Sequence, residues 1–449
     1  MSEVGSILRD WVGVCAGSAS TSVLIVLVPG ALVAACPVPV RLVVTEWRAQ
    51  LSGVAQVAPF QTGFRTDDDY LTVTMLAVGL ARILRRRSPH RQGAGRDSDG
   101  LLPATWRVAF SRLWWRCHEQ GVTAPDNDLE LLGWCTTPFA VWNVALRLSE
   151  ADLQQCLLVG DELSDFGEQS ARLGGGDIEA EWQENLTYAA LRAAAQANGG
   201  GDGKRTDLVY GTLRRRLIDY PVVSDRVVLN WEREFARTDG SGQTYVRHLV
   251  NAAYIARSQP GKFRYLRCPG CKNTVPSPQS ACGTPGCASG TAESASTTAL
   301  AVVYEQHRAT RRFIRDPGLV EGRLFDALNG EKFTGRVRVI PYPALDTLDI
   351  LVEFLSPGDG EPAVEDTWGA DAKDHASARL LGRSFTWPSG EPECSQRFLV
   401  LPAHRADEPG YIADLTGELE GRVSGVQVVS EKRFLTLVAN RVRQIGGIR

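Results

Sequence analysis

Lysine is the cation that this chain uses least, because its 449 residues contain six lysines against forty-three arginines. Arginine is therefore the default surface cation, and a retained lysine is a candidate for chemistry that a guanidinium cannot perform. An ammonium group changes its pKa readily when it is desolvated, whereas a guanidinium stays protonated at any useful pH. This contrast singles out Lys373, in the segment WGADAKDHASARLL.

A strong positive charge and a membrane-spanning segment are also missing. The formal net charge is −3, so a polyanion has to bind a local patch rather than respond to an overall field. The apolar run over 22–36 is shorter than a bilayer span and is interrupted by Pro29 and Gly30. We therefore expect a cytoplasmic protein with reduced thiols and no membrane association.

The distribution of apolar and turn-forming residues predicts an α+β multidomain protein. A first α/β region of unknown role, 1–95, is followed by a mainly helical region, 96–260. A cysteine-rich segment covers 261–292. Strand-like alternation mixed with helices then fills 293–449, a normal length for one α/β domain.

Four further segments carry local predictions. The glycine-rich stretch 199–207 lacks the spacing of a phosphate-binding loop, so we expect a flexible linker there. The arginine run 214–216 is typical of a solvated helix face, with phosphate contact as the alternative. We expect a short joint over 291–298 and a helix over 298–314.

Four of the ten cysteines have the spacing of a zinc ribbon. Cys268 and Cys271 are separated by two residues, and Cys282 and Cys287 by four, with a polar loop between the pairs. Each short spacing turns the chain so that two sulfurs face one point, and two such turns complete a tetrahedron of thiolates around Zn²⁺. With four protein ligands no position is open for water, so the zinc would be structural. A pair of disulfides is the alternative in an oxidising compartment.

Basic residues interleaved with an aromatic residue surround these cysteines and favour contact with nucleic acid. The residues concerned are Lys262, Arg264, Arg267 and Lys272, with Tyr265 among them. The alternative is that the ribbon only braces a domain junction.

An acidic pair accompanies Lys373. Asp371 lies two residues before it on a predicted strand, so both side chains project from one face. Asp349 begins an earlier apolar strand, and an antiparallel hairpin would bring it beside them. Two carboxylates there would form an oxygen site for Mg²⁺ or Mn²⁺, and the lysine could orient or deprotonate a water. The alternative is a chance triplet with an ion pair on the wet face of a strand.

The order of elements around these residues is that of a PD-(D/E)xK nuclease core. Residues 300–449 resemble the restriction-endonuclease-like domain found beside pPIWI-RE proteins, which are prokaryotic PIWI/Argonaute-like proteins encoded in conflict operons with a DinG-type helicase. The stretches that carry the resemblance are YEQHRATRRFIRDPGLVEGRLFDAL, LDTLDILVEF and WGADAKDHASARLL.

The resemblance implies a Mg²⁺-dependent endonuclease, a hydrolase that cleaves DNA or an RNA–DNA hybrid in anti-invader defence, with a PIWI-like protein and a helicase as partners. It implies that Asp349 and Asp371 bind the metal, that Lys373 is the catalytic lysine, and that Glu321 is an accessory acid. The chain departs from the usual motif by having Asp371 where glutamate is commoner. His375 is expected to begin the next helix rather than to contact phosphate.

Two other functions compete with this one. A non-catalytic adaptor would use the nuclease-like fold and the zinc ribbon only to bind nucleic acid or to scaffold a partner. A zinc-ribbon DNA-binding regulator is the third possibility, but it would leave Lys373 without a role.

Overall fold

The structure of the protein, a computed structural model, describes most of the chain after its first 67 residues. The apolar run over 22–36 and most of the predicted α/β region 1–95 lie outside the described residues. The described ranges are 68–87, 102–175, 178–275, 282–287, 290–356, 363–388 and 392–446. None of the helices in these ranges combines the length and apolar character that a bilayer span requires.

The first described region is a group of helices packed around one apolar core. Its helices are α3 (Asp69–Arg87), α4 (Ala104–Gln120), α5 (Asp128–Cys135), α6 (Glu150–Leu153) and α7 (Asp165–Leu173). Buried residues recur every three to four positions along α3, at Tyr70, Val73, Leu76 and Leu80, which is the spacing of one helix face. A side chain at Gly79 would meet Trp106 of α4, so this glycine lets the two helices approach closely.

A second helical group follows and packs with a small sheet. Its helices are α8 (Ile178–Gly199), α9 (Gly203–Asp219), α10 (Asp225–Glu234) and α11 (Tyr245–Ala253). Of the linker predicted over 199–207, only 200–202 form a turn between α8 and α9, and 203–207 begin α9. Gly200 and Gly201 have φ values of 65° and 88°, which glycine adopts without steric cost, and the Asp202 side chain caps α9.

The small sheet has the strand order β3–β7–β4, and all its pairs are antiparallel. The strands are β3 (Val222–Ser224), β4 (Tyr254–Ser258) and β7 (Val302–Gln306). The helix predicted over 298–314 is therefore wrong in its first half, because β7 fills the gap between two strands from an earlier part of the chain. Helical structure begins at α12 (Arg308–Thr310).

An antiparallel hairpin carries the four clustered cysteines. Its strands are β5 (Gly261–Arg267) and β6 (Glu293–Ala299), and the cysteines lie on the chain between them. The joint predicted over 291–298 is thus mostly strand β6, whose residues pair in register with β5.

The C-terminal region is a mixed sheet with helices on both faces. Its strand order is β12–β11–β10–β9–β8, with antiparallel pairs from β8 to β10 and parallel pairs from β10 to β12. The strands are β8 (Val337–Pro341), β9 (Ile350–Leu355), β10 (Val364–Ala372), β11 (Gln396–Leu401) and β12 (Val426–Ser430). The mixed α and β content and the predicted β9–β10 hairpin are confirmed.

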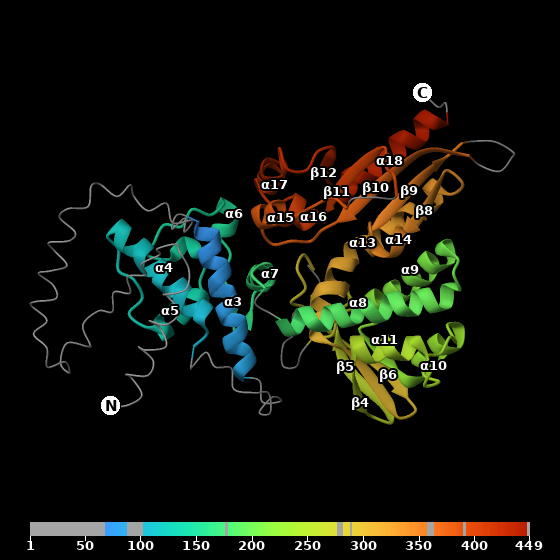
Figure 1. Ribbon diagram of the computed structural model, residues 1–449, viewed down its shortest axis with the longest axis horizontal. Helices are drawn as coiled ribbons and strands as arrows, with labels where there is room; N and C mark the ends of the chain where they lie inside the picture. The colour runs from blue at the N-terminus through green and yellow to red at the C-terminus, as the bar shows by residue number, and fades with distance from the viewer. Residues whose placement is uncertain are drawn as a thin grey trace, which may run out of the picture. The chain divides into compact units, whose positions relative to one another are not determined.

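Two separate apolar clusters show which helices cover which face. Residues of α13 (Asp316–Leu328) and α18 (Glu431–Ile445) pack with Phe398 and Val400 of β11. Residues of α15 (Ala378–Ser384) and α17 (Tyr411–Leu419) pack with the alternate residues of the same strand, Leu399 and Leu401. A strand buried on both faces is typical of a sheet covered by helices (Figure 1).

Candidate functional site

The β9–β10 hairpin brings the two predicted metal-binding aspartates together. Ala370 pairs with Ile350, so the next position along the register places Asp371 beside Asp349. Asp349 accepts a hydrogen bond from the backbone nitrogen of Ala372 at 2.6 Å, and the two carboxyl groups share a hydrogen bond. Both side chains are buried, so the pair is held in one arrangement.

Lys373 follows directly after β10 and completes the constellation. Its backbone nitrogen donates to the carbonyl oxygen of Val400 at 3.0 Å, which fixes the chain against β11. Its Nζ contacts Asp371 Oδ1 and lies 3.8 Å from Asp349 Oδ2. The Lys373 side chain is 39% exposed while both acids are buried, so the lysine is the member of the trio with the most contact with solvent.

Each charged group of this trio shifts the pKa values of the other two. Burial raises the pKa of Asp371 to about 8; Asp349 adds to the shift and Lys373 opposes it. Burial would also raise the pKa of Asp349, but the ammonium of Lys373 and the hydrogen bond from Asp371 hold it below the usual value. Burial alone would lower the pKa of Lys373, but the two carboxylates hold it above its ordinary value. The pKa values of the two neighbouring carboxyl groups are thus shifted in opposite directions, a pattern typical of functional sites.

A second acidic pair, Glu321 and Asp346, lines the same cavity and is bound by one arginine. Arg214 of α9 donates to both oxygens of Glu321, at 3.0 and 3.1 Å from Nη2, and to Asp346 Oδ2 at 2.8 Å from Nη1. The Arg214 side chain is only 4% exposed, and its guanidinium lies over the ring of Tyr342. Burial raises the pKa of Glu321 to about 7 against the opposing effect of Arg214. Glu321 therefore lies near the predicted site, but both its oxygens are bound to Arg214.

The four acids do not form one shared ligand cage. Among the described residues, the cysteine cluster is the one group of three or more thiol, imidazole or carboxylate groups that converges on a point. The acid site is accordingly a two-carboxylate site with Lys373 beside it. Glu321 and Asp346 line the same cavity but are bound by Arg214.

A cavity of about 530 Å³ opens in front of the trio, and we call it the acid pocket. Its lining includes Asp349, Asp371 and Lys373, together with residues of α7 and α8. From α7, Gln169 accepts a hydrogen bond from the backbone nitrogen of Ala376 at 2.5 Å and donates to the carbonyl oxygen of Asp374 at 3.3 Å. Helix α7 thus holds the backbone just after the lysine.

The two residues after Lys373 have structural partners. Asp374 accepts from His404 at 3.1 Å and from Arg405 at 2.9 Å. The His375 ring bonds the backbone of Ser377, the N-cap of α15, as expected for a histidine that begins a helix. Burial lowers the pKa of His375 to about 4, so the ring is neutral near pH 7.

The predicted nucleic-acid contacts lie elsewhere. Lys262, Arg264 and Arg267 are on β5, and Lys272 follows Cys271. Arg267 is paired with Glu293 at 2.5 Å, and Lys272 Nζ donates to the carbonyl oxygen of Pro269 at 2.6 Å. None of these four is among the described residues that line the acid pocket.

The four cysteines converge as the sequence predicts. Their sulfur atoms lie within 4.8 Å of one another, and the pairs Cys268–Cys287 and Cys271–Cys282 are each 3.4 Å apart. These separations are far longer than the roughly 2.05 Å of a disulfide bond. Zn–S bonds of about 2.3 Å in a tetrahedron require a sulfur spacing of this order, so the four thiols fit one Zn²⁺ ion.

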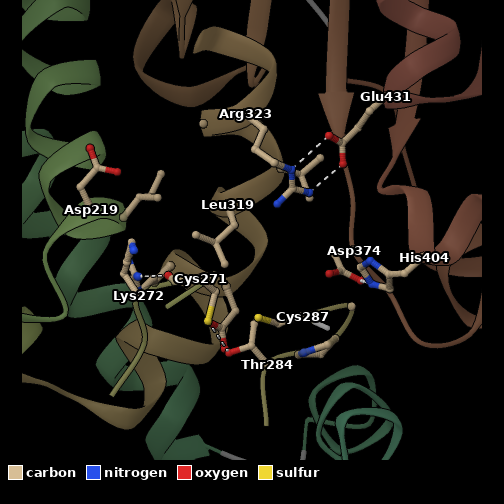
Figure 2. Close-up of a pocket in the computed structure, with 18 of the residues that line it drawn as sticks. Asp219, Cys271, Lys272, Thr284, Cys287, Leu319, Arg323, Asp374, His404 and Glu431 are labelled. Carbon is tan, nitrogen blue, oxygen red and sulfur yellow. Dashed lines mark hydrogen bonds and ion pairs between the residues drawn. The ribbon is translucent and has the colours of Figure 1, made fainter. Parts of the chain in front are cut away.

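The cysteine cluster is anchored to the start of α13. Asn273 is fully buried and donates to Asp316 Oδ1 at 2.6 Å, while Arg315 Nε donates to Asn273 Oδ1 at 2.5 Å. Arg315 also donates to the carbonyl oxygen of Cys271 at 2.6 Å. Figure 2 shows Cys271 and Cys287 beside a second cavity, of about 490 Å³, whose lining also includes Asp374 and His404.

Sequence reasoning missed Arg214 and Gln169. The arginine run was expected to be a solvated face or a phosphate contact, but Arg214 points inward and its neighbours pair with surface acids. A signal was present, because the buried positions Tyr210, Leu213 and Leu217 place Arg214 on the same helix face. No comparable local signal distinguishes Gln169.

Two family models match parts of the chain. Residues 96–224 match the model described as pPIWI_RE three-gene island domain Y, and residues 318–445 match the model described as REase associating with pPIWI_RE. The chain belongs to the pPIWI-RE system. The resemblance found in the sequence is thereby confirmed, and a restriction-endonuclease-like domain is indicated for the second segment. Neither a curated protein nor a solved structure matches the chain.

The two pPIWI-RE segments meet at the acid pocket. Gln169 and Arg214 belong to the segment that matches domain Y, whereas Asp349, Asp371 and Lys373 belong to the restriction-endonuclease segment. All five residues line the same cavity.

Proposed function

We propose that this pPIWI-RE protein is a divalent-metal-dependent nuclease of the PD-(D/E)xK type. The observation that supports the proposal is the convergence of Asp349, Asp371 and Lys373 at one end of the β9–β10 hairpin, with a cavity in front of them. Buried carboxylates with a specific charged partner, lining a cavity, are typical of functional sites that hold a cation and a reacting group together.

The donor set of this site suits Mg²⁺ or Mn²⁺. Asp349 and Asp371 supply hard oxygen ligands, and both line the acid pocket. A divalent cation bound there would polarise a phosphodiester and neutralise its developing charge.

The chain's own residues then have separate tasks. Lys373 keeps its proton because two carboxylates surround it, so it would act as a fixed cation that orients water and phosphate rather than as a base. Gln169 fixes the backbone that follows this lysine, through its hydrogen bonds to Asp374 and Ala376. Glu321, bound by Arg214, is an accessory acid behind the ligands rather than a ligand itself.

The substrate and partners follow from the same assignment. DNA or an RNA–DNA hybrid would be the substrate, and a PIWI-like protein and a DinG-type helicase would be the partners, in the cytoplasm of a prokaryotic cell. Zn²⁺ in the cysteine cluster would be structural, since four thiolates leave no open position. The exposed side chains of Lys262 and Arg264 remain our proposed contacts to nucleic acid, together with Arg267 and Lys272.

A cleavage assay tests the proposal. The full chain is incubated with plasmid, a duplex, a hybrid and single strands, in Mg²⁺ or Mn²⁺. Lys373→Ala and Asp371→Ala should each lose cleavage by about 100-fold or more, whereas Lys432→Ala, at an exposed lysine of α18, should cleave like the wild type.

Two results would contradict the nuclease assignment. Equal cleavage by the wild type and by both site variants would place the activity outside the trio. Binding of nucleic acid without cleavage, in either cation, would favour the adaptor.

A further inference from the structure

Asp349 follows a backbone turn, 342–346, whose conformation is unusual for its residues. Tyr342, Ala344, Leu345 and Asp346 have φ values of 51°, 50°, 56° and 82°, all in the left-handed region. None of them is glycine, and side chains crowd the backbone in this conformation. Such a turn persists only when neighbouring structure fixes it.

This turn controls where Asp349 lies. The backbone nitrogen of Tyr342 donates to the carbonyl oxygen of Asp349 at 2.9 Å, which closes the loop between β8 and β9. Asp346 lies three residues before Asp349 and enters the acidic group from the same turn. A change in the turn would therefore move the metal-binding carboxylate.

Helix α9 supplies the contacts that fix the turn. Asp207 accepts hydrogen bonds from the backbone nitrogens of Ala344 and Leu345, both at 3.1 Å. Tyr210 donates to Asp346 Oδ2 at 3.0 Å, and Arg214 donates to the same oxygen at 2.8 Å. The spacings of three and four residues place Asp207, Tyr210 and Arg214 on one face of the helix.

Arg214 also divides the four acids into two pairs, because it binds Glu321 and Asp346 but not Asp349 or Asp371. It binds Glu321 through both carboxylate oxygens and Asp346 through one, so a single guanidinium pairs with two of the four carboxylates. Asp349 and Asp371 are left to be balanced by Lys373 and by a bound cation.

We propose that Asp207 and Arg214 are positioning residues of the nuclease site, which makes α9 of the domain Y segment a required part of the metal site. The inference rests on the proposed function. Neither residue belongs to the trio; each acts through the turn 342–346 or through the acids behind it. The two matched segments thus form one catalytic unit.

Mn²⁺ affinity of the full chain, measured by calorimetry, is the first readout. Asp207→Ala and Arg214→Lys should raise the Mn²⁺ dissociation constant by about 10- to 100-fold, as expected when a group that orients a ligand is lost. Asp207→Asn keeps one acceptor oxygen and should restore part of the affinity. The matched controls Asp219→Ala and Arg216→Lys change the same helix at residues with partners outside the acid pocket, and should bind like the wild type.

Hydrogen exchange over 343–349 is the second readout, and it separates a loosened turn from a general loss of fold. Faster exchange in this turn together with weaker Mn²⁺ binding in Asp207→Ala supports the inference, even if Arg214→Lys fails to fold. Faster exchange with wild-type Mn²⁺ affinity overturns it. If Asp371→Ala binds Mn²⁺ as tightly as the wild type, the proposed function itself falls, and the inference falls with it.

Discussion

Asn273 connects the cysteine cluster to the helix behind the acid pocket, and replacing it should loosen the cluster. Its buried amide makes hydrogen bonds to Asp316, Thr284 and Arg315 at 2.6, 2.7 and 2.5 Å. Two of the three partners are charged. Hydrogen bonds to charged groups contribute about 1.5–3 kcal/mol each and neutral ones about 1 kcal/mol. The substitution Asn273→Ala should therefore cost about 4–7 kcal/mol of unfolding free energy.

Release of Zn²⁺ to a coloured chelator during urea unfolding measures this cost. With a denaturant dependence of about 2 kcal/mol per molar urea, a loss of 4 kcal/mol lowers the midpoint of release by about 2 M. The control Asn329→Ala removes one exposed hydrogen bond, to the carbonyl oxygen of Phe325, and should leave the midpoint unchanged. A midpoint for Asn273→Ala equal to that of the wild type would refute the claim that this amide holds the cluster to α13.

Three further predictions concern the restriction-endonuclease-like domain. Lys373→Arg should lower the cleavage rate by about 100-fold in single-turnover assays while Mn²⁺ still binds, because a guanidinium keeps the charge but not the compact ammonium geometry. In the folded chain the pKa of His375 is lowered to about 4, so the unfolded chain takes up a proton at this residue at a higher pH than the folded chain does. The contribution of the neutral ring to the unfolding free energy is therefore fully present above about pH 6.5 and is lost as the pH falls towards 4. His375→Gln should flatten that part of a plot of unfolding free energy against pH, and an unchanged slope would contradict the burial of the ring. Phe398→Ala should cost about 3–5 kcal/mol of unfolding free energy in urea titrations, against less than about 0.5 kcal/mol for Val364→Ala at an exposed strand start.

The features that the sequence predicted correctly depend on short-range patterns. The β9–β10 hairpin follows from two strand-like apolar segments that are close along the chain, and its register places Asp349 beside Asp371. The cysteine cluster follows from two short spacings, each of which folds back on itself. In both cases the residues that meet are close along the chain or belong to neighbouring strands.

The features that were missed depend on distant partners. Strand β7 contains residues that also suit a helix, but it lies between β3 and β4, and the β3 residues that it pairs with lie about eighty positions earlier. Arg214 meets Glu321 across 107 residues, so no local pattern names its partner. The left-handed turn 342–346 contains no glycine that would predict it from the sequence, and side chains of the distant helix α9 form the hydrogen bonds that fix it.

The buried contacts of Arg214 determine where the chain can be divided. A fragment limited to 318–445 would keep Glu321 and Asp346 but lose the Arg214 guanidinium that binds both carboxylates. Breaking a buried ion pair costs about 3–5 kcal/mol, a large part of the roughly 5–15 kcal/mol that stabilises a whole domain. We therefore expect a fragment cut at these boundaries to aggregate or be proteolysed during purification, whereas one that begins before α8 should stay soluble and resist protease.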